Sequence, residues 1–335
     1  GEVPEQWLVP PAVFVSDYVL GKFSDRAPAL GLDVLGLSGG SIIEDFDGDG
    51  LLDVMASSWG LADPLLYFRN GGDGAFADQT AAAGLGGQVG GLNITHADYD
   101  NNGYADVLVL RGAWWNEDGH HPNSLLRNDG GQFVDVTETT GLLSFHPTQT
   151  AAWGDYDNDG FVDLYIGNES NDWERHACQL YHNQGGEAFV ERAQGLGIDN
   201  IGYVKGVAWG DVDNDGDIDI FVLNLNDLPT LLRNEGGNKN NWLLVKTVGT
   251  KSNRDGIGAK IKIHYGTHRQ ISEVRSGSSY LSQNDLRVHF GLGQNDTIDL
   301  LEIIWPSGLI DRFNDVSTNR IIVVEEGKGL SSLSP

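Results

Sequence analysis

Short apolar runs recur along the chain between residues 38 and 237, and they are too short and too rich in β-branched and aromatic residues for helices. Two clear examples, residues 106–110 (Asp-Val-Leu-Val-Leu) and 219–223 (Asp-Ile-Phe-Val-Leu), follow acidic loops and predict buried strands. Within each of four similar units, one strand is expected before the acidic loop, one after it, a third that ends in an Asn turn, and in most units a fourth that opens with Phe. The pattern predicts an all-β fold of four-stranded units.

The acidic loops have a regular spacing. Their first residues are Asp45, Asp98, Asp155 and Asp211, so the repeat period is 53 to 57 residues. This period is near the blade length of a β-propeller, in which four-stranded sheets are arranged around an axis. We therefore expect a propeller with blades near residues 38–90, 91–145, 146–203 and 204–237.

Each loop carries oxygen-bearing residues at its positions 1, 3, 5 and 9 and a glycine at position 6, which is the pattern of a calcium-binding loop. An EF-hand would need Glu at position 12, where this chain has Ala56, Val109, Ile166 and Val222, so the loops connect strands instead of helices. With a backbone carbonyl at position 7, the predicted ligands are Asp45, Asp47, Asp49, Leu51 and Asp53; Asp98, Asp100, Asn102, Tyr104 and Asp106; Asp155, Asp157, Asp159, Phe161 and Asp163; and Asp211, Asp213, Asp215, Asp217 and Asp219.

We expect about four Ca²⁺ ions, one for each loop, because clustered carboxylates repel one another strongly without a cation. Asn102 replaces an aspartate in the second loop, which should bind most weakly, whereas Asp217 adds charge to the fourth loop. An ordinary solvated turn would explain a single Asp/Asn/Gly cluster, but it does not explain four copies.

One strand at the N-terminus lacks a unit of its own. Residues 23–32 repeat the fourth-strand pattern, and the fourth unit lacks that strand. Pairing of residues 23–32 with residues 231–233 would close a ring of four blades and remove exposed edges. Two alternatives are that residues 242–248 supply the missing strand, or that the C-terminal domain takes the place of a further blade and the N-terminal strand covers an edge.

Residues 238–335 lack the repeat and alternate polar with apolar positions, which predicts a separate small β domain after a propeller domain of residues 1–237. The net charge of −27 disfavours nucleic acid and anionic membranes as partners, and no apolar run is long enough for a membrane helix. Cys178 is the single cysteine, so an internal disulfide is excluded.

The acidic loops resemble FG-GAP/VCBS propeller repeats. The motifs Gly249-Thr-Lys-Ser-Asn-Arg-Asp-Gly-Ile-Gly-Ala259, Ser276-Gly-Ser-Ser-Tyr-Leu-Ser282 and Trp305-Pro-Ser-Gly308 resemble the ASPIC/UnbV domain of the cartilage acidic protein family. Together the two resemblances cover nearly the whole chain. They imply a calcium-binding propeller that is secreted or lies in the cell envelope or periplasm, and they supply no catalytic residues.

Blade topology places the acidic loops on one face and the longer, variable connections on the other. Aromatic side chains beside acids and amides on such loops suit a glycan, although these tryptophans could instead cap the core. A pair of adjacent histidines, His120 and His121, is only a weak metal signal. The predicted ligand-binding residues are Trp59, Trp114, Trp115, His120, His146, Trp173 and His176.

The chain contains no nucleophile elbow, phosphate-binding glycine loop, zinc-protease motif or dinucleotide fingerprint, and no catalytic residue is predicted. We expect a calcium-stabilised binding or adhesion module outside the cytoplasm, with a glycan or an extracellular protein as partner. A carbohydrate-active or biosynthetic enzyme of the lyase type, with its site on the variable face, is the main alternative. A structural accessory domain of a larger assembly is the third.

Overall fold

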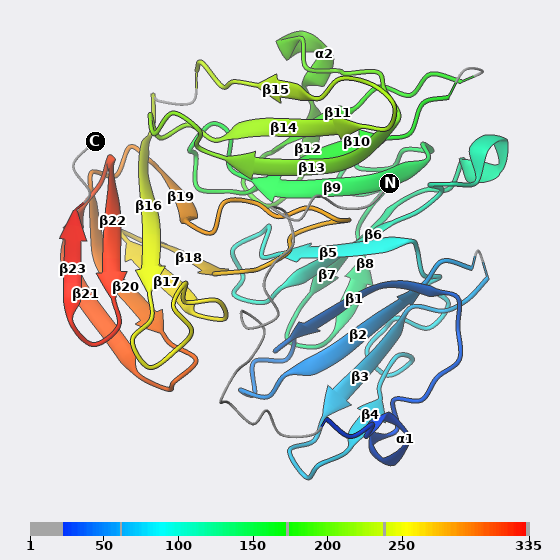
Figure 1. Ribbon diagram of the computed structural model, residues 1–335, viewed down its shortest axis with the longest axis horizontal. Helices are drawn as coiled ribbons and strands as arrows, with labels where there is room; N and C mark the ends of the chain where they lie inside the picture. The colour runs from blue at the N-terminus through cyan, green and yellow to red at the C-terminus, as the bar shows by residue number, and fades with distance from the viewer. Residues whose placement is uncertain (1–22, 61, 172–173, 237–238, 333–335) are drawn as a thin grey trace, which may run out of the picture.

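The computed structural model describes residues 23–60, 62–171, 174–236 and 239–332, which form six antiparallel or mixed β-sheets and very little helix (Figure 1). Sheet 1 contains β1 (Ser38–Glu44), β2 (Asp53–Ser58), β3 (Leu66–Asn70) and β4 (Phe76–Asp78). Sheet 2 contains β5 (Asn93–Ala97), β6 (Asp106–Leu110), β7 (Ser124–Asn128) and β8 (Phe133–Asp135). Sheet 3 contains β9 (Thr148–Gly154), β10 (Asp163–Asn168), β11 (Gln179–Asn183) and β12 (Phe189–Glu191). Sheet 4 contains β13 (Val204–Gly210), β14 (Asp219–Asn224) and β15 (Thr230–Leu232). The all-β prediction is confirmed.

Sheets 1 to 4, which we call the repeat sheets, follow one plan, and in each of them the acidic loop joins the first strand to the second. Each sheet pairs its strands antiparallel in chain order, as short connections between neighbouring strands require. Three apolar cores lie between consecutive sheets: Phe46 and Tyr67 pack against Phe133 between sheets 1 and 2, and two similar clusters join sheets 2 to 3 and 3 to 4. Burial of these side chains holds the sheets in a row.

The predicted ring closure is wrong for the part of the chain that the structure describes. Residues 23–32 form no strand; instead Ala27–Leu30 is a helical turn, α1, which begins where the Asp25 carboxylate accepts the Ala27 N–H at 3.0 Å. Gly31 lies against the Phe76 carbonyl of β4, as Gly84 and Gly141 lie against the outer strands of the next sheets. The N-terminal turn therefore packs on sheet 1, and sheet 4 has three strands with β15 at its edge.

The last eight strands form two sheets that share one core, and we call residues 241–332 the C-terminal sandwich. The first sheet contains β19 (Val288–Gly293), β16 (Asn241–Val248), β22 (Arg320–Glu325) and β23 (Gly329–Ser332). The second contains β18 (His268–Glu273), β17 (Lys260–Tyr265), β20 (Thr297–Ile304) and β21 (Ile310–Ser317). Leu243, Ile261, Phe290 and Trp305 meet between them. Because β16 pairs with β19 and β22, residues 242–248 do not supply the fourth strand of sheet 4.

The connection from β18 to β19 reaches from the sandwich across the first strands of the repeat sheets (Figure 1). The Ser279 hydroxyl bonds with Thr150 Oγ1 of β9 at 2.8 Å and accepts from Asn93 Nδ2 of β5 at 3.3 Å. Further along, Asn284 Oδ1 accepts the Trp209 N–H of β13 at 3.0 Å. The Ser276–Ser282 motif thus attaches the sandwich to the repeat sheets.

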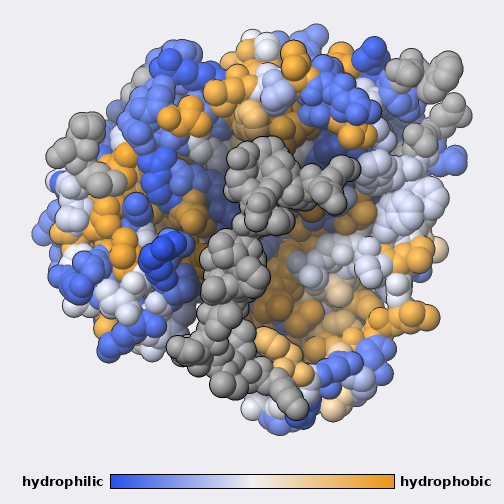
Figure 2. Space-filling view, viewed as in Figure 1, coloured by the Kyte–Doolittle hydropathy of each residue, from blue (hydrophilic) through white to orange (hydrophobic). Residues whose placement is uncertain are grey.

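The visible surface carries both hydrophilic and apolar regions. Figure 2 shows hydrophilic side chains over much of one face and apolar side chains within a hollow near its middle. Among the described residues, no helix has the length and apolar composition needed to cross a bilayer.

Candidate functional site

The four acidic loops have the same local geometry. The position-6 glycine N–H donates to the first aspartate of its loop: Gly50 to Asp45 at 3.1 Å, Gly103 to Asp98 at 2.9 Å, Gly160 to Asp155 at 2.8 Å and Gly216 to Asp211 at 3.1 Å. All four glycines have φ between +88° and +101°, a conformation that favours glycine. The N–H of the seventh residue, Leu51, Tyr104, Phe161 or Asp217, donates to the side chain at position 5. Each loop therefore curls around its own acidic side chains.

The donor set fits a hard cation such as Ca²⁺. Three carboxylate oxygens, Asp45 Oδ1, Asp98 Oδ1 and Asp157 Oδ1, are buried without a hydrogen-bond partner. Such atoms are costly unless a cation or donor satisfies them. The carboxylate oxygens of the first three loop aspartates lie within 4.8 Å of one another in loops one and three, and those of Asp98, Asp100 and Asp106 do so in loop two. These are oxygen groups of the kind that Ca²⁺ binds.

Burial also raises the pKa of several loop carboxyl groups. The pKa of Asp98 rises to about 7 and that of Asp106 to about 9, with burial the main cause and neighbouring carboxylates adding to it. Burial and the charge of Asp163 raise the pKa of Asp155 well above its usual range. A bound cation would offset this cost of holding the carboxylates ionised.

The ninth aspartates have an additional structural role that the sequence pattern did not show. Asp106 accepts the Tyr99 N–H at 3.0 Å and the Asn128 N–H at 2.7 Å, so it ties the loop to the Asn turn of the same sheet. Asp163 and Asp219 make the same pair of bonds. Asp53 accepts the Asn70 N–H at 2.8 Å and the Tyr67 hydroxyl at 2.8 Å.

A set of basic side chains beside the loops was not predicted from the sequence. Arg69 Nη2 lies 2.7 Å from Asp49, Arg233 Nε lies 2.7 Å from Asp213, and His182 Nδ1 lies 3.2 Å from Asp163. All three directly precede the Asn of a hairpin turn, at Asn70, Asn234 and Asn183. The position directly before the turn Asn is the sequence signal that identifies these side chains. The two arginines balance part of the carboxylate charge.

The loops form a continuous row because each Asn turn also reaches the previous loop. Asn128 Nδ2 donates to the Phe46 carbonyl at 2.9 Å, Asn183 Nδ2 to Tyr99 at 2.8 Å and Asn234 Nδ2 to Tyr156 at 2.7 Å. Adjacent loops touch as well, since Asn101 Nδ2 donates to the Gly160 carbonyl at 2.9 Å. A loop that is held in one conformation therefore restrains the backbone of the neighbouring loop.

The C-terminal sandwich sits directly on this row. The Gly293 N–H donates to the Asn158 carbonyl at 2.8 Å, and Arg287 Nη2 donates to the Asp211 carbonyl at 2.8 Å. A Cβ atom at Gly291 would lie 2.0 Å from Asp155 Oδ2, so only glycine fits against the third loop. The acidic loops are thus both candidate metal sites and the seat of the sandwich.

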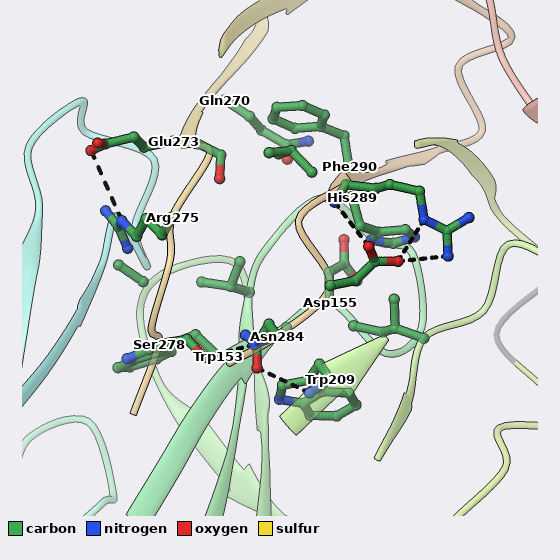
Figure 3. Close-up of a pocket in the computed structure, with 18 of the residues that line it drawn as sticks. Trp153, Asp155, Trp209, Gln270, Glu273, Arg275, Ser278, Asn284, His289 and Phe290 are labelled. Atoms are coloured by element: carbon green, nitrogen blue, oxygen red, sulfur yellow. Dashed lines mark hydrogen bonds and ion pairs between the residues drawn. The ribbon is translucent and has the colours of Figure 1, made fainter. Parts of the chain in front are cut away.

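A cavity of about 190 Å³ lies between the sandwich and the repeat sheets (Figure 3). Glu273 and Arg275 line one side, and His289, whose Nε2 lies 3.2 Å from the Gly216 carbonyl oxygen, lines another. Burial lowers the pKa of His289 to about 4, so this imidazole is neutral at neutral pH. The cavity belongs to the contact between the sandwich and the loop row.

The predicted ligand-binding residues also come together, away from the acidic loops. The rings of Trp59 and Trp115 lie 4.9 Å apart, and Lys205 Nζ lies 3.2 Å from the Trp114 ring centroid and pairs with Glu169. Burial lowers the pKa of Lys205 and raises that of Glu169.

The predicted histidines form a neighbouring cluster with Glu174. His120 Nε2 is 3.0 Å from Glu174 Oε1, and the ring centroids of His146 and His176 are 5.2 Å apart. Backbone hydrogen bonding to Phe145 raises the pKa of His120, whereas burial lowers the pKa of His146 and His176. Trp173 lies outside the described residues.

The chain is similar in sequence to known proteins and matches models of two protein families. The chain is 27% identical over 274 residues to human cartilage acidic protein 1 (78% of this chain and 40% of that protein), and 28% identical over 260 residues to its counterpart from Xenopus tropicalis (74% and 38%). The chain thus spans less than half the length of these relatives. The V. cholerae biofilm matrix protein Bap1 aligns in structure with a TM-score of 0.34 and 12% identity over 88% of this chain and 50% of that chain, which is too low to establish a common fold.

The family models account for most of the sequence. The FG-GAP-like repeat model matches residues 45–109, 113–166 and 167–222, segments that contain all four acidic loops. The ASPIC and UnbV model matches residues 249–331, within the sandwich. The chain therefore belongs to the family of FG-GAP-like repeat proteins that carry an ASPIC and UnbV domain.

Proposed function

We propose that the protein is an extracytoplasmic interaction module in which calcium holds the acidic loops in the form that seats the C-terminal sandwich. The observation that carries this proposal is the set of direct contacts from Gly291, Gly293 and Arg287 to the third and fourth loops. Ordering a loop by Ca²⁺ would order the groups that these residues touch. The ion would then hold the C-terminal sandwich in place on the repeat sheets.

Four ions, one per loop, bound by the predicted oxygen ligands, are part of this proposal. Without a Glu at position 12, affinities on the order of 10⁻⁴ to 10⁻³ M are expected, which is typical of extracellular modules. The cartilage acidic proteins found as relatives are consistent with an extracellular location. We further propose that residues 1–237 form a propeller-like domain, with the repeat sheets as its blades, and that residues 238–335 form the second domain.

Isothermal calorimetry of the chelator-treated protein tests the calcium sites. We expect about four Ca²⁺ ions per chain, and one fewer in Asp157→Ala, because Asp157 contributes a buried oxygen without a hydrogen-bond partner in the third loop. Asp33→Ala is the matched control, since Asp33 is exposed and lies outside the loops. Equal stoichiometry in wild type and Asp157→Ala would contradict the assignment of the third loop.

A glycan is the second candidate partner, and the aromatic face supports it. The Trp115 ring lies 4.9 Å from the Trp59 ring, tilted by 35°, and Trp114 is 42% exposed beside the Lys205–Glu169 pair. These residues give apolar area next to charged hydrogen-bonding groups. A glycan array probed with wild type and with Trp115→Ala tests this. Phe221→Ala, which removes an exposed aromatic from sheet 4, is the control.

Loss of array binding in Trp115→Ala alone would support the glycan proposal. Binding that is unaffected by Trp115→Ala, or absent from the wild type in both calcium and chelator, would contradict it and leave a protein partner. Shortening of a bound glycan during incubation would instead support the alternative of a lyase-like enzyme.

A further inference from the structure

Three histidines and a glutamate from separate segments converge beside the aromatic face. His120 follows the short helix at Asn116–Gly119, His146 lies in the connection between sheets 2 and 3, and Glu174 and His176 lie in the loop before β11. One ligand atom from each of His120, Glu174 and His176 lies within 4.8 Å of the other two. This cluster is separate in chemistry from the acidic loops, because it contributes imidazole nitrogens as well as carboxylate oxygens.

The orientation of His120 is fixed by a backbone group. Its Nδ1 lies 3.1 Å from the Phe145 carbonyl oxygen, and a carbonyl oxygen only accepts hydrogen bonds, so Nδ1 carries a proton. In the neutral ring, the lone pair of Nε2 is then directed at the Glu174 carboxylate, with Oε1 at 3.0 Å and Oε2 at 3.1 Å. A lone pair facing a carboxylate is unfavourable unless a cation or a second proton lies between them.

His176 is held in a similar way by another histidine. Its Nδ1 lies 3.1 Å from Nδ1 of His146, so one ring donates to the other. Its Nε2 is buried without a hydrogen-bond partner and lies 3.6 Å from Glu174 Oε2, and the side chain is only 8% exposed. If His176 is the donor to His146, its Nε2 lone pair is also directed at Glu174.

The separations between these atoms match a metal coordination shell. Bonds of about 2.0 Å at tetrahedral angles place ligand atoms about 3.3 Å apart. Glu174 Oε2 lies 3.1 Å from His120 Nε2 and 3.6 Å from His176 Nε2. Metal-binding histidines usually donate their other ring N–H to a backbone carbonyl or another acceptor. The Phe145 carbonyl has that position for His120, and Nδ1 of His146 has it for His176 when His176 is the donor.

We propose that His120, Glu174 and His176 bind a divalent transition-metal ion of the Zn²⁺ type, with His146 as a positioning residue. Imidazole and carboxylate suit Zn²⁺ and related first-row ions, whereas Ca²⁺ takes oxygen ligands. Three protein ligands leave a fourth position open. The side chains of His120 and Glu174 are 41% and 39% exposed, so this position faces solvent and is accessible to water or to a ligand with an anionic or nitrogen donor.

Zinc calorimetry on the calcium-saturated full chain tests the proposal, because saturation limits binding of Zn²⁺ to the acidic loops. We expect one tight site in the wild type, and affinity at least about 100-fold weaker in His176→Ala and Glu174→Gln, each of which removes a ligand. His146→Ala should weaken binding by about 10- to 100-fold, the range for outer-shell residues. His121→Ala, next to His120 but outside the cluster, should bind as the wild type does.

Visible absorption of Co²⁺ in the same site provides a second readout, since a four-coordinate cobalt spectrum should disappear in Glu174→Gln. If His176→Ala fails to fold, His120→Ala replaces it, because the His120 side chain is partly exposed and its loss leaves no buried void. Absence of tight Zn²⁺ binding in the wild type would overturn the proposal. Tight binding that survives both Glu174→Gln and His120→Ala would overturn it as well.

Discussion

Replacement of Glu44 by Gln should weaken the attachment of the C-terminal sandwich to sheets 1 and 2. Glu44, the last residue of β1, is 5% exposed. Its carboxylate lies 2.9 Å from Lys260 Nζ and 3.5 Å from Arg275 Nη2, both in the sandwich, and 3.6 Å from His96 Nε2 of sheet 2. The glutamine retains an acceptor for the Asp45 N–H but removes the charge that these groups share.

The expected loss of stability follows from the burial of the partners. Breaking a fully buried ion pair costs about 3–5 kcal/mol. The Lys260 and Arg275 side chains are 31% and 30% exposed, so water satisfies part of their charge, and we expect about 2–3 kcal/mol. For 335 residues that unfold together, an unfolding entropy of about 0.7 kcal/mol/K converts this to a fall in Tm of about 3–4 °C.

The effect should also depend on pH with a defined sign. Burial raises the pKa of Glu44, but the hydrogen bond from His96 and the charges of Arg275 and Lys260 outweigh burial and hold the pKa well below its usual range. A carboxyl group with a lowered folded pKa stabilises the fold above its unfolded pKa, and this stability is lost as the pH falls. The difference between wild type and Glu44→Gln should therefore shrink in acid.

Thermal unfolding in saturating calcium measures this difference. Glu138→Gln is the control, because Glu138 is exposed, and its Tm should stay close to that of the wild type. A Tm for Glu44→Gln that equals that of Glu138→Gln at neutral pH would refute the role given to this carboxylate.

Three further predictions concern the acidic loops. Gly216→Ala should lower the Tm more than Gly185→Ala. Both glycines have positive φ, but a Cβ at Gly216 would lie 1.9 Å from Trp242, whereas a Cβ at Gly185 would meet nothing within 4 Å. Equal Tm values would contradict the packing of the sandwich on the fourth loop. The rise in Tm that calcium produces should be larger near about pH 8 than near about pH 5.5. The raised pKa values of Asp98 and Asp106 stabilise the ion-free fold at low pH, and this stability is lost as the pH rises through those values. A rise in Tm that is independent of pH would argue against the role of these two carboxyl groups. Asn102→Asp should strengthen calcium binding at the second loop in calorimetry, since it restores the missing charge; unchanged affinities would remove the predicted ranking.

The sequence predicted local structure well, because each repeat contains the residues that determine its own fold. Aspartates at fixed spacing, a glycine that permits positive φ and an Asn turn determine how one sheet folds, whatever its neighbours are. The prediction failed locally at residues 23–32, which were expected to form a strand. They contain the helical turn α1, which ends at Gly31 with a left-handed φ as α2 (Ala193–Leu196), after the outer strand of sheet 3, ends at Gly197.

Long-range placement was harder to predict for a physical reason. The pattern of residues 23–32 matches a fourth strand, so these residues were predicted to pair with residues 231–233 of sheet 4, which lacks one. In the structure Gly31 instead lies against the Phe76 carbonyl of sheet 1. The seat of the sandwich depends on shape and on single hydrogen bonds, such as that of Ser279 with Thr150, which have no periodic signal. Likewise, His120 meets Glu174 and His176 only through the packing of sheets 2 and 3, so the adjacent pair His120–His121 was a poor guide.

Calcium in the acidic loops should stabilise both the repeat sheets and their contact with the C-terminal sandwich. Thermal unfolding of the full chain in chelator and in millimolar Ca²⁺ measures this stabilisation. A ligand that binds only the folded state stabilises it by about 2.7 kcal/mol per site at a hundredfold excess over Kd. We therefore expect a clearly higher Tm in calcium. A Tm that is the same in chelator and in calcium would contradict it.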